Sequence, residues 1–217
     1  MISLRIIPKI IFKPGEAFEE LKGNITGEDG VIIFLIVSVV SLLTFGFFTK
    51  LLGINIMAVQ FGFGTILNLG NAILFLGIEF FSLVLIAYIA NLIALKLGGS
   101  GEFYETFSFF CYAKSLNFVQ ATASIVVNVW LYLKVLETIS ALNTGNILEP
   151  TYLSQLAQII PMLFIIFSLW LIYIMANAIS TAHNISKLKG FAAVIITNFI
   201  TGAAIFVILN LAGIRLV

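Results

Sequence analysis

The fold is decided most clearly by residues 71–97, NAILFLGIEFFSLVLIAYIANLIALKL. This stretch is apolar apart from a few polar residues, among them Glu79 within it and Lys96 near its end. A helix needs about 20 largely apolar residues to cross a hydrocarbon core of about 30 Å, and its backbone groups must bond within the segment because lipid offers no partners. The stretch is therefore predicted to be a transmembrane helix.

Four other apolar stretches resemble it in length and character. Hydrophobic residues make up 61% of the chain and charged residues only 10%, whereas about a quarter of the residues in soluble domains are charged. A soluble fold is excluded, because it could not bury this much apolar surface. We predict an all-α integral membrane protein, a single membrane domain over residues 1–217, with five transmembrane helices in a compact bundle: about 31–49, 71–97, 103–130, 153–181 and 190–212.

The N-terminal segment, residues 1–30, interleaves apolar residues with charges. Pro14 is suited to a helix start, and Glu16 would lie near the positive end of the helix dipole. We predict that Pro14 to Lys22 is an N-terminal interfacial amphipathic helix lying on the cytoplasmic membrane surface. A frayed tail is the alternative. The mixture of signs argues against strong attraction to anionic lipid, which typically requires a polybasic patch.

The distribution of basic residues predicts the orientation. Positive residues concentrate on cytoplasmic loops, and with five spans the N-terminus shares its side with two of the connections. That side carries seven basic residues: Arg5, Lys9, Lys13, Lys22, Lys96, Lys187 and Lys189. The other side carries Lys50, Lys134 and Arg215. We expect a multi-pass protein of the cell membrane with a cytoplasmic N-terminus and an extracytoplasmic C-terminus. The first span is too long for an ordinary signal-peptide core, so we expect it to persist.

A polar stripe on the third span is the strongest sign of a site. Its members follow helical spacings of three and four and so share one face: Lys114, Asn117, Gln120, Ser124 and Asn128. An ionisable residue inside a span is costly and tends to face a bundle interior or a watery cavity, which makes the stripe a candidate binding site. The alternative is that the amides hold helices together while the Lys114 side chain extends to the membrane surface.

Glu79 is the candidate intramembrane acid that could pair with Lys114. From Glu79 to Leu97 a helix descends about 27 Å, whereas from Phe103 to Lys114 it climbs only about 17 Å. The two side chains are therefore expected at levels about 10 Å apart. A direct ion pair is not expected from these heights.

Several short elements resemble a known family when they are taken in order. They are Pro14-Gly15-Glu16-Ala17-Phe18-Glu19-Glu20-Leu21, then Gly98-Gly99-Ser100-Gly101-Glu102-Phe103 leading to Tyr112-Ala113, then Trp170 followed by His183, Ser186 and Lys187. Their order and spacing, together with five spans, resemble the Ypt-interacting-protein, or Yip, family of five-span membrane proteins. The resemblance covers nearly the whole chain.

Membership would imply a role in membrane organisation. Eukaryotic members of the Yip family are associated with Rab-type GTPases and vesicle traffic, whereas prokaryotic members mostly lack an assigned activity. This chain resembles the prokaryotic branch, because it lacks an Asp-Leu-Tyr-Gly-Pro type of sequence before the first span. Ser115-Leu116-Asn117 also stands where the family often places a proline after Tyr-Ala. Both departures weaken any transfer of GTPase binding.

The predicted function is that of a non-enzymatic protein that organises membranes or recruits partners. A small transporter or channel that uses the polar stripe is the alternative. Expected partners are membrane lipid, other membrane or cytoplasmic proteins, and further copies of the chain; nucleic acid is not expected. The candidate cytoplasmic contact residues are Pro14, Phe18, Leu21, His183, Lys187 and Lys189.

One short stretch of the sequence matches a known catalytic pattern. Gly98-Gly99-Ser100-Gly101 fits the Gly-x-Ser-Gly pattern of rhomboid proteases, and His183 is expected on the same membrane side. A nucleophilic pair requires contact between serine and histidine, and rhomboids use at least six spans. We therefore predict no catalytic residues and assign Ser100 to a turn between helices. The sequence shows no metal-ligand cluster and no Walker motif, so neither a metal nor a cofactor is expected.

Overall fold

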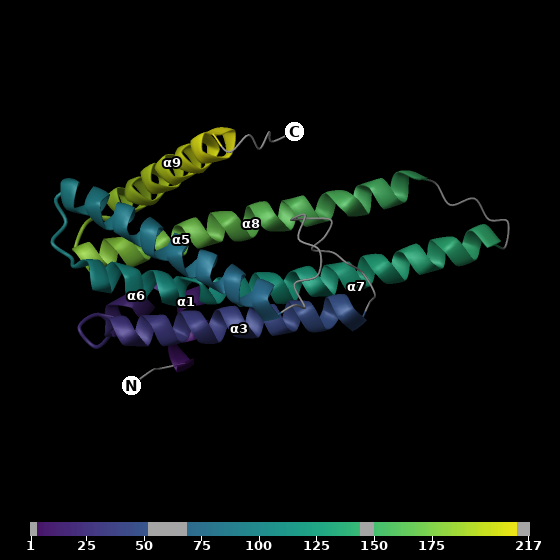
Figure 1. Cartoon of the computed structure of the whole chain (residues 1–217), viewed down its shortest axis with the longest axis horizontal. Coiled ribbons are helices and arrows are strands. Elements are labelled where there is room, and N and C mark those ends of the chain that lie inside the picture. Colours follow the sequence, from purple (N-terminus) through teal and green to yellow (C-terminus); the bar gives the residue numbers. More distant parts are fainter. Residues whose placement is uncertain (1–3, 52–68, 144–149, 212–217) are drawn as a thin grey trace. The chain divides into compact units, whose positions relative to one another are not determined.

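The computed structural model describes residues 4–51, 69–143 and 150–211, and within them some side chains of α3, α5, α7, α8 and α9 are also left undescribed. The described chain is helical and contains no strand, which confirms the all-α prediction (Figure 1). A short 3₁₀ turn, Leu4–Ile6, leads into the helices. These are α1 (Ile7–Phe12), α2 (Pro14–Leu21), α3 (Gly27–Leu51), α5 (Leu69–Lys96), α6 (Phe103–Ala113), α7 (Ser115–Asn143), α8 (Pro150–His183) and α9 (Lys187–Leu211).

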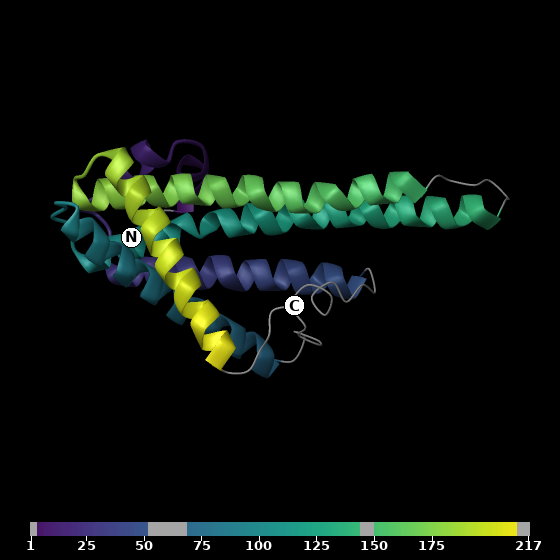
Figure 2. The same ribbon diagram turned by 90° about the horizontal axis from the view of Figure 1, so that it is seen from above.

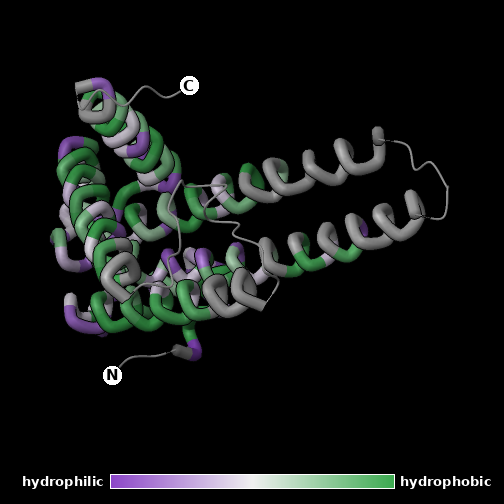
Figure 3. The backbone as a smooth tube through the Cα atoms, turned by 45° about the vertical axis from the view of Figure 1, so that its right-hand side comes forward, coloured by the Kyte–Doolittle hydropathy of each residue, from purple (hydrophilic) through white to green (hydrophobic). Residues whose placement is uncertain are grey.

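Membrane-spanning character is clear in the described helices. Three segments are long and apolar enough to cross a bilayer, namely Leu76–Lys96, Ile165–His183 and Lys187–Val207. Figure 3 shows hydrophobic residues along most of α5 and α9. The protein is therefore a membrane protein built from helices, and the count of five spans stays a prediction.

The predicted third span differs from the structure at two points. The helix is interrupted at Lys114, between α6 and α7, and it continues beyond Trp130 as far as Asn143. Residues 131–143, LYLKVLETISALN, contain neither glycine nor proline. The helix therefore runs past the predicted end of the span near Trp130, because charged and polar residues alone do not stop a helix that meets no breaker. The bounds of the span itself stay a prediction.

The chain forms two compact units. The first consists of Met1–Leu35, Leu76–Ser115 and Leu171–Val217, and the second of Ile36–Phe75 and Leu116–Trp170. The boundaries between the units fall within α3, α5, α7 and α8. The expectation of a single membrane domain is not tested by this division and stays a prediction. All contacts described below lie within the first unit.

Aromatic side chains form much of the core of the first unit. The Phe18 and Phe109 ring centroids lie 4.9 Å apart and join α2 to α6. The Phe80 ring of α5 lies 5.3 Å from that of Phe34 on α3 and 6.0 Å from that of Phe107 on α6. Offset and edge-on aromatic pairs contribute about 0.5–1.5 kcal/mol beyond the area that they bury. These rings fasten α2, α3 and α5 around α6.

Small residues allow the helices of this unit to approach closely. A Cβ atom at Gly30 on α3 would stand 2.8 Å from the Ser108 Cα on α6. A Cβ atom at Gly190 on α9 would stand 2.5 Å from the Ala176 carbonyl oxygen on α8. Both distances are too short for a real side chain, so these positions require glycine. Close backbone approach at small residues is the usual way in which membrane helices associate.

Helix α2 buries one face against the first unit. Pro14, Ala17, Phe18 and Leu21 are buried at helical spacing, and Phe18 is 0% exposed. The intervening Glu16, Glu19 and Glu20 are exposed. The amphipathic pattern of the sequence is therefore satisfied by packing onto the chain's own helices.

We expect Phe18→Ala to lower the free energy of unfolding by about 3 kcal/mol, because it removes a fully buried ring and leaves a cavity beside Phe109. Thermal unfolding of the detergent-purified protein measures this effect. The matched control is Phe12→Ala at the end of α1, where the side chain is 77% exposed and little change is expected. Equal losses in the two variants would contradict the buried position of Phe18.

Candidate functional site

The two ionisable side chains expected inside the membrane form an ion pair. The Lys114 Nζ atom donates a hydrogen bond to the Glu79 Oε1 atom at 3.1 Å. The two side chains are 19% and 20% exposed, respectively. Charged side chains within a membrane are commonly paired, since each would otherwise face lipid alone. The positive charge of Lys114 is thus balanced by a residue of α5.

The expected separation of about 10 Å between these two levels was therefore wrong. That expectation treated α5 and α6 as parallel helices starting from a common turn. Figures 1 and 2 show α5 running at a slant across α6, so Glu79 advances less along the direction of α6 than its distance along α5 suggests. Two long flexible side chains close the remaining gap.

The polar stripe is divided by the helix break. Lys114 lies at the end of α6, where its backbone N–H donates to the Phe110 carbonyl oxygen at 3.1 Å. Asn117 and Gln120 lie on α7 and are partly buried, whereas the side chains of Ser124 and Asn128 lie outside the described residues. The structure joins Lys114 to Glu79, and a binding role for the stripe as a whole stays a prediction.

His183 lies at the centre of a buried hydrogen-bond network and is 1% exposed. The Gly101 backbone N–H donates to the His183 Nδ1 atom at 3.2 Å. Because Nδ1 accepts this bond, we assign the ring proton to Nε2, which lies 2.9 Å from the Thr106 Oγ1 atom. Thr106 Oγ1 is in turn 3.5 Å from the Asn91 Oδ1 atom. The ring therefore connects the end of α8 to the turn before α6 and to α5.

The turn from Gly98 to Gly101 is shaped by this contact. Gly98 has a φ of +91°, a conformation that favours glycine. A Cβ atom at Gly99 would stand 2.7 Å from the His183 Cβ atom. The Ser100 backbone N–H donates to the His183 carbonyl oxygen at 3.1 Å. Both ring nitrogens of His183 are engaged by Gly101 and Thr106, so the serine-protease pattern is a packed turn.

Comparison of the chain with models of protein families gives a match over most of its length. The model of the Yip1 domain matches residues 9–209. The chain belongs to the Yip1 domain family. Neither a curated protein nor a solved structure matches the chain. The earlier resemblance to the Yip family is confirmed.

The predicted contact residues of this Yip1 domain divide into buried and exposed sets. Pro14, Phe18, Leu21 and His183 are buried within the chain. They pack within the first unit, and a role for them in contact with a partner stays a prediction. Lys187 and Lys189 are exposed, and the Lys189 Nζ atom donates to the Leu97 carbonyl oxygen at 2.8 Å. The apolar spacing of α2 is compatible with burial against lipid, against a partner or against the chain itself. The sequence alone could not show which of these three surfaces the apolar face contacts.

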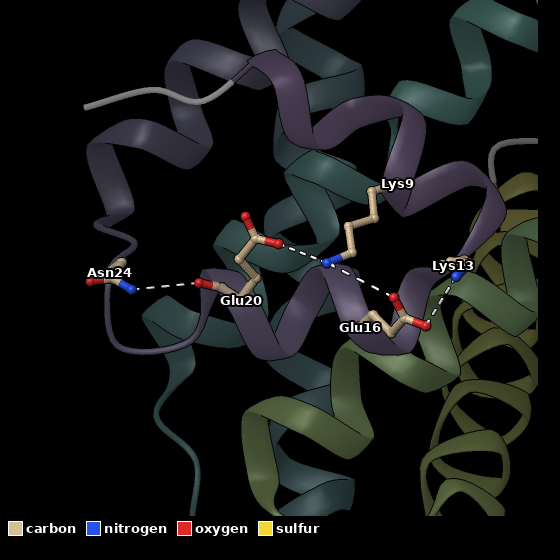
Figure 4. A network of polar contacts seen from close by, with 5 residues as sticks. All are labelled: Lys9, Lys13, Glu16, Glu20 and Asn24. Carbon is tan, nitrogen blue, oxygen red and sulfur yellow. Dashed lines mark hydrogen bonds and ion pairs between the residues drawn. The ribbon is translucent and has the colours of Figure 1, made fainter.

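Ion pairs on the exposed side of α1 and α2 were not anticipated from the sequence. The Lys9 ammonium donates to the Glu20 carboxylate at 2.7 Å and lies 4.0 Å from Glu16, while Lys13 lies 3.4 Å from Glu16 (Figure 4). The hydrogen bond to Glu20 raises the pKa of Lys9 above its ordinary value. Such exposed pairs contribute little stability. They arrange a surface of alternating charges on the Yip1 domain.

Lys22 fastens the end of α2 to the end of α8 and to the residue that follows it. The Lys22 Nζ atom donates to the Thr181 carbonyl oxygen and to the Asn184 Oδ1 atom, both at 2.5 Å. Asn184 has a φ of +53°, a conformation that asparagine tolerates better than most residues.

No group of three or more His, Cys, Asp or Glu side chains that could hold a metal is found in the described part of the Yip1 domain.

Proposed function

We propose that this Yip1-domain protein is a non-enzymatic, five-span protein of the cell membrane that recruits partner proteins or organises the bilayer. Its N-terminus is cytoplasmic and its C-terminus extracytoplasmic in this proposal, as the distribution of lysine and arginine suggests. The observation that carries the proposal is the fastened pair of helices α1 and α2. Buried Phe18 and the bonds of Lys22 hold them to α6 and to the end of α8.

The proposed contact surface is the exposed, charged face of these helices. It consists of Lys9, Lys13, Glu16, Glu19 and Glu20, which we call the α1–α2 charged face. A face held in place by a packed core is suited to recognition, because little conformational entropy is lost when a partner binds. Opposite charges arranged at fixed positions give specificity more than affinity. Partner choice is therefore proposed to depend on these charges and not on the buried apolar residues.

The ion pair of Lys114 favours this function over transport. The transport alternative was motivated by the polar stripe within the membrane, in which Lys114 carries the only charge. Glu79 neutralises that charge within the chain itself, so a bound anion is not needed for balance. We therefore interpret the pair as a structural contact between α5 and the α6–α7 junction.

We expect the triple variant Glu16→Gln, Glu19→Gln and Glu20→Gln to lose at least about fivefold in recovery of the proteins that cross-link to the full-length protein in its native membrane. A tenfold loss corresponds to about 1.4 kcal/mol, which the removal of a few interfacial charges can account for. Quantitative mass spectrometry of the cross-linked proteins measures the change. Thermal unfolding verifies that the variant stays folded.

The matched control replaces Glu28 and Glu102 by glutamine. Both are exposed acidic residues of the first unit that lie outside the α1–α2 charged face. The control is expected to retain the cross-linked proteins. If the triple variant retained them equally well, the proposed contact surface would be rejected.

A further inference from the structure

Two buried side-chain atoms of the first unit have no hydrogen-bond partner among the described residues, the Ser115 Oγ atom and the Asn177 Oδ1 atom. Asn177 on α8 is 2% exposed, and its Oδ1 atom accepts no hydrogen bond. Its Nδ2 atom donates to the Tyr173 carbonyl oxygen at 2.8 Å, which fixes the orientation of the amide. A buried acceptor without a donor costs about 1–3 kcal/mol, and such an atom in a folded protein calls for a physical explanation.

The free oxygen of Asn177 faces the first turn of α2. A Cβ atom built at Gly15 would lie 3.2 Å from Asn177 Oδ1 and 3.7 Å from the Lys187 Nζ atom. Gly15 is the second residue of α2, and Lys187 is the first residue of α9. Because Gly15 has no side chain, the position that its Cβ atom would occupy is empty. The Asn177 Oδ1 atom, the Lys187 ammonium group and the first turn of α2 surround that position.

These groups are complementary to an anion that also carries a hydrogen-bond donor. The first backbone N–H groups of a helix lack intrahelical partners, and the helix dipole favours negative charge there. Lys187 is exposed and has no ion-pair partner among the described residues. Asn177 Oδ1, by contrast, can only accept a hydrogen bond. A plain anion would satisfy Lys187 and leave Asn177 unsatisfied.

Glu16 is the acidic residue that could oppose an anion at this position. Its carboxylate lies 3.4 Å from the Lys13 ammonium and 4.0 Å from that of Lys9. Lys9 is bonded more closely to Glu20, at 2.7 Å, so these two lysines and two glutamates balance one another. Lys187, which lies on the Asn177 side of Gly15, is the positive charge that is left for a phosphate group.

We propose that Gly15, Asn177 and Lys187 form a binding site for a phosphate group that has a hydroxyl group beside it, as in the glycerol phosphate headgroup of phosphatidylglycerol. The phosphate oxygens accept from Lys187 and from the backbone N–H groups of Gly15 and Glu16, since Pro14 has no N–H and the Ala17 N–H donates to the Lys13 carbonyl oxygen. The neighbouring hydroxyl donates to Asn177 Oδ1. The same chemistry is present in free glycerol phosphate, so the source of the headgroup is decided by experiment.

The test is native mass spectrometry of the full-length protein, released from detergent after incubation with short-chain phosphatidylglycerol or phosphatidylcholine. We expect selective retention of phosphatidylglycerol. Lys187→Gln and Gly15→Ala are each expected to reduce that retention at least about tenfold, a loss of the size associated with one charge-assisted hydrogen bond. The Gly15→Ala methyl group would occupy the position between Asn177 and Lys187.

Two variants serve as matched controls. Lys96→Gln removes another exposed lysine, and Gly27→Ala adds a methyl group at another first-turn glycine that has no neighbour within 4 Å. Both are expected to retain phosphatidylglycerol as the unchanged protein does. Equal retention in all variants would overturn the site and assign the free oxygen of Asn177 to a water molecule or to a shifted Lys187 side chain.

A competition arm distinguishes the two sources of the headgroup. Millimolar glycerol phosphate is added to the unchanged protein and to Lys187→Gln. If it displaces the lipid from the unchanged protein but does not displace the lipid that still binds to Lys187→Gln, the site takes the free phosphate ester. Retention of phosphatidylglycerol despite that competitor would indicate a lipid site. Either result supports the proposed chemistry, whereas equal binding of phosphatidylcholine contradicts it. Failure of the α1–α2 charged-face test would leave this result unaffected.

Discussion

Gly101→Ala is expected to lower the free energy of unfolding by about 3 kcal/mol, the upper end of the usual cost of overpacking. The added Cβ atom would overlap the Ala182 carbonyl oxygen and stand 3.0 Å from the His183 Cα atom. These are backbone atoms, so no side-chain rotation relieves the overlap. The turn must move away from α8, and the bond from the Gly101 N–H to His183 is lost with it. Thermal unfolding in detergent, followed by tryptophan fluorescence, measures the loss.

Gly27→Ala is the control for this substitution. No atom lies within 4 Å of the Cβ position at Gly27, and alanine is favoured over glycine in a helix by about 1 kcal/mol. Its stability is expected to be unchanged or slightly raised. If Gly101→Ala were as stable as Gly27→Ala, the close approach between the turn and the end of α8 would be incorrect.

The second large effect is expected from Glu79→Leu. This substitution leaves the Lys114 ammonium without its partner in a mostly buried position. Removing one member of a buried ion pair typically costs 3–5 kcal/mol, and we expect about 3 kcal/mol here because both side chains keep some exposure. The double variant Glu79→Leu and Lys114→Leu is expected to recover most of this loss, since replacing the whole pair by apolar residues is often neutral. Unfolding measurements on the single and double variants form a double-mutant cycle.

An exposed acid of the same unit supplies the control. Glu102→Gln is expected to change the stability by less than about 0.5 kcal/mol, as for most surface substitutions. If the losses of the single variants Glu79→Leu and Lys114→Leu summed to the loss of the double variant, the cycle would show no coupling between Glu79 and Lys114. The ion pair would then contribute nothing to the fold.

The helices were predictable from sequence because their signal is local. Long apolar stretches predict helices in lipid without knowledge of their neighbours, and the described helices include each predicted span over most of its length. The extension of α7 to Asn143 was missed because polarity was taken as the end of the helix. Helix breakers are a more reliable criterion, since residues 131–143 contain neither glycine nor proline.

The contacts within the candidate site were not predictable in the same way. Lys114 and Glu79 were identified as the important charges, but their pairing depends on the slant of α5, which no local pattern encodes. His183 lies 82 residues from Gly101 and 77 from Thr106 in the sequence. A histidine between helices is equally compatible with an exposed loop. The packing that buries His183 involves Gly99 and Gly101. Because these residues have no side chains, their backbone can approach the end of α8 closely.

Helix α8 has a consequence for how the protein fits its membrane. Its 34 residues measure about 51 Å along the axis, whereas a hydrocarbon core is about 30 Å thick. The candidate spans within α5, α8 and α9 have 21, 19 and 21 residues and so measure about 29–32 Å, close to that thickness. A thinner or thicker bilayer is therefore expected to mismatch all three spans alike. The whole of α8 exceeds the hydrocarbon core by about 20 Å, so it must tilt or extend beyond the lipid.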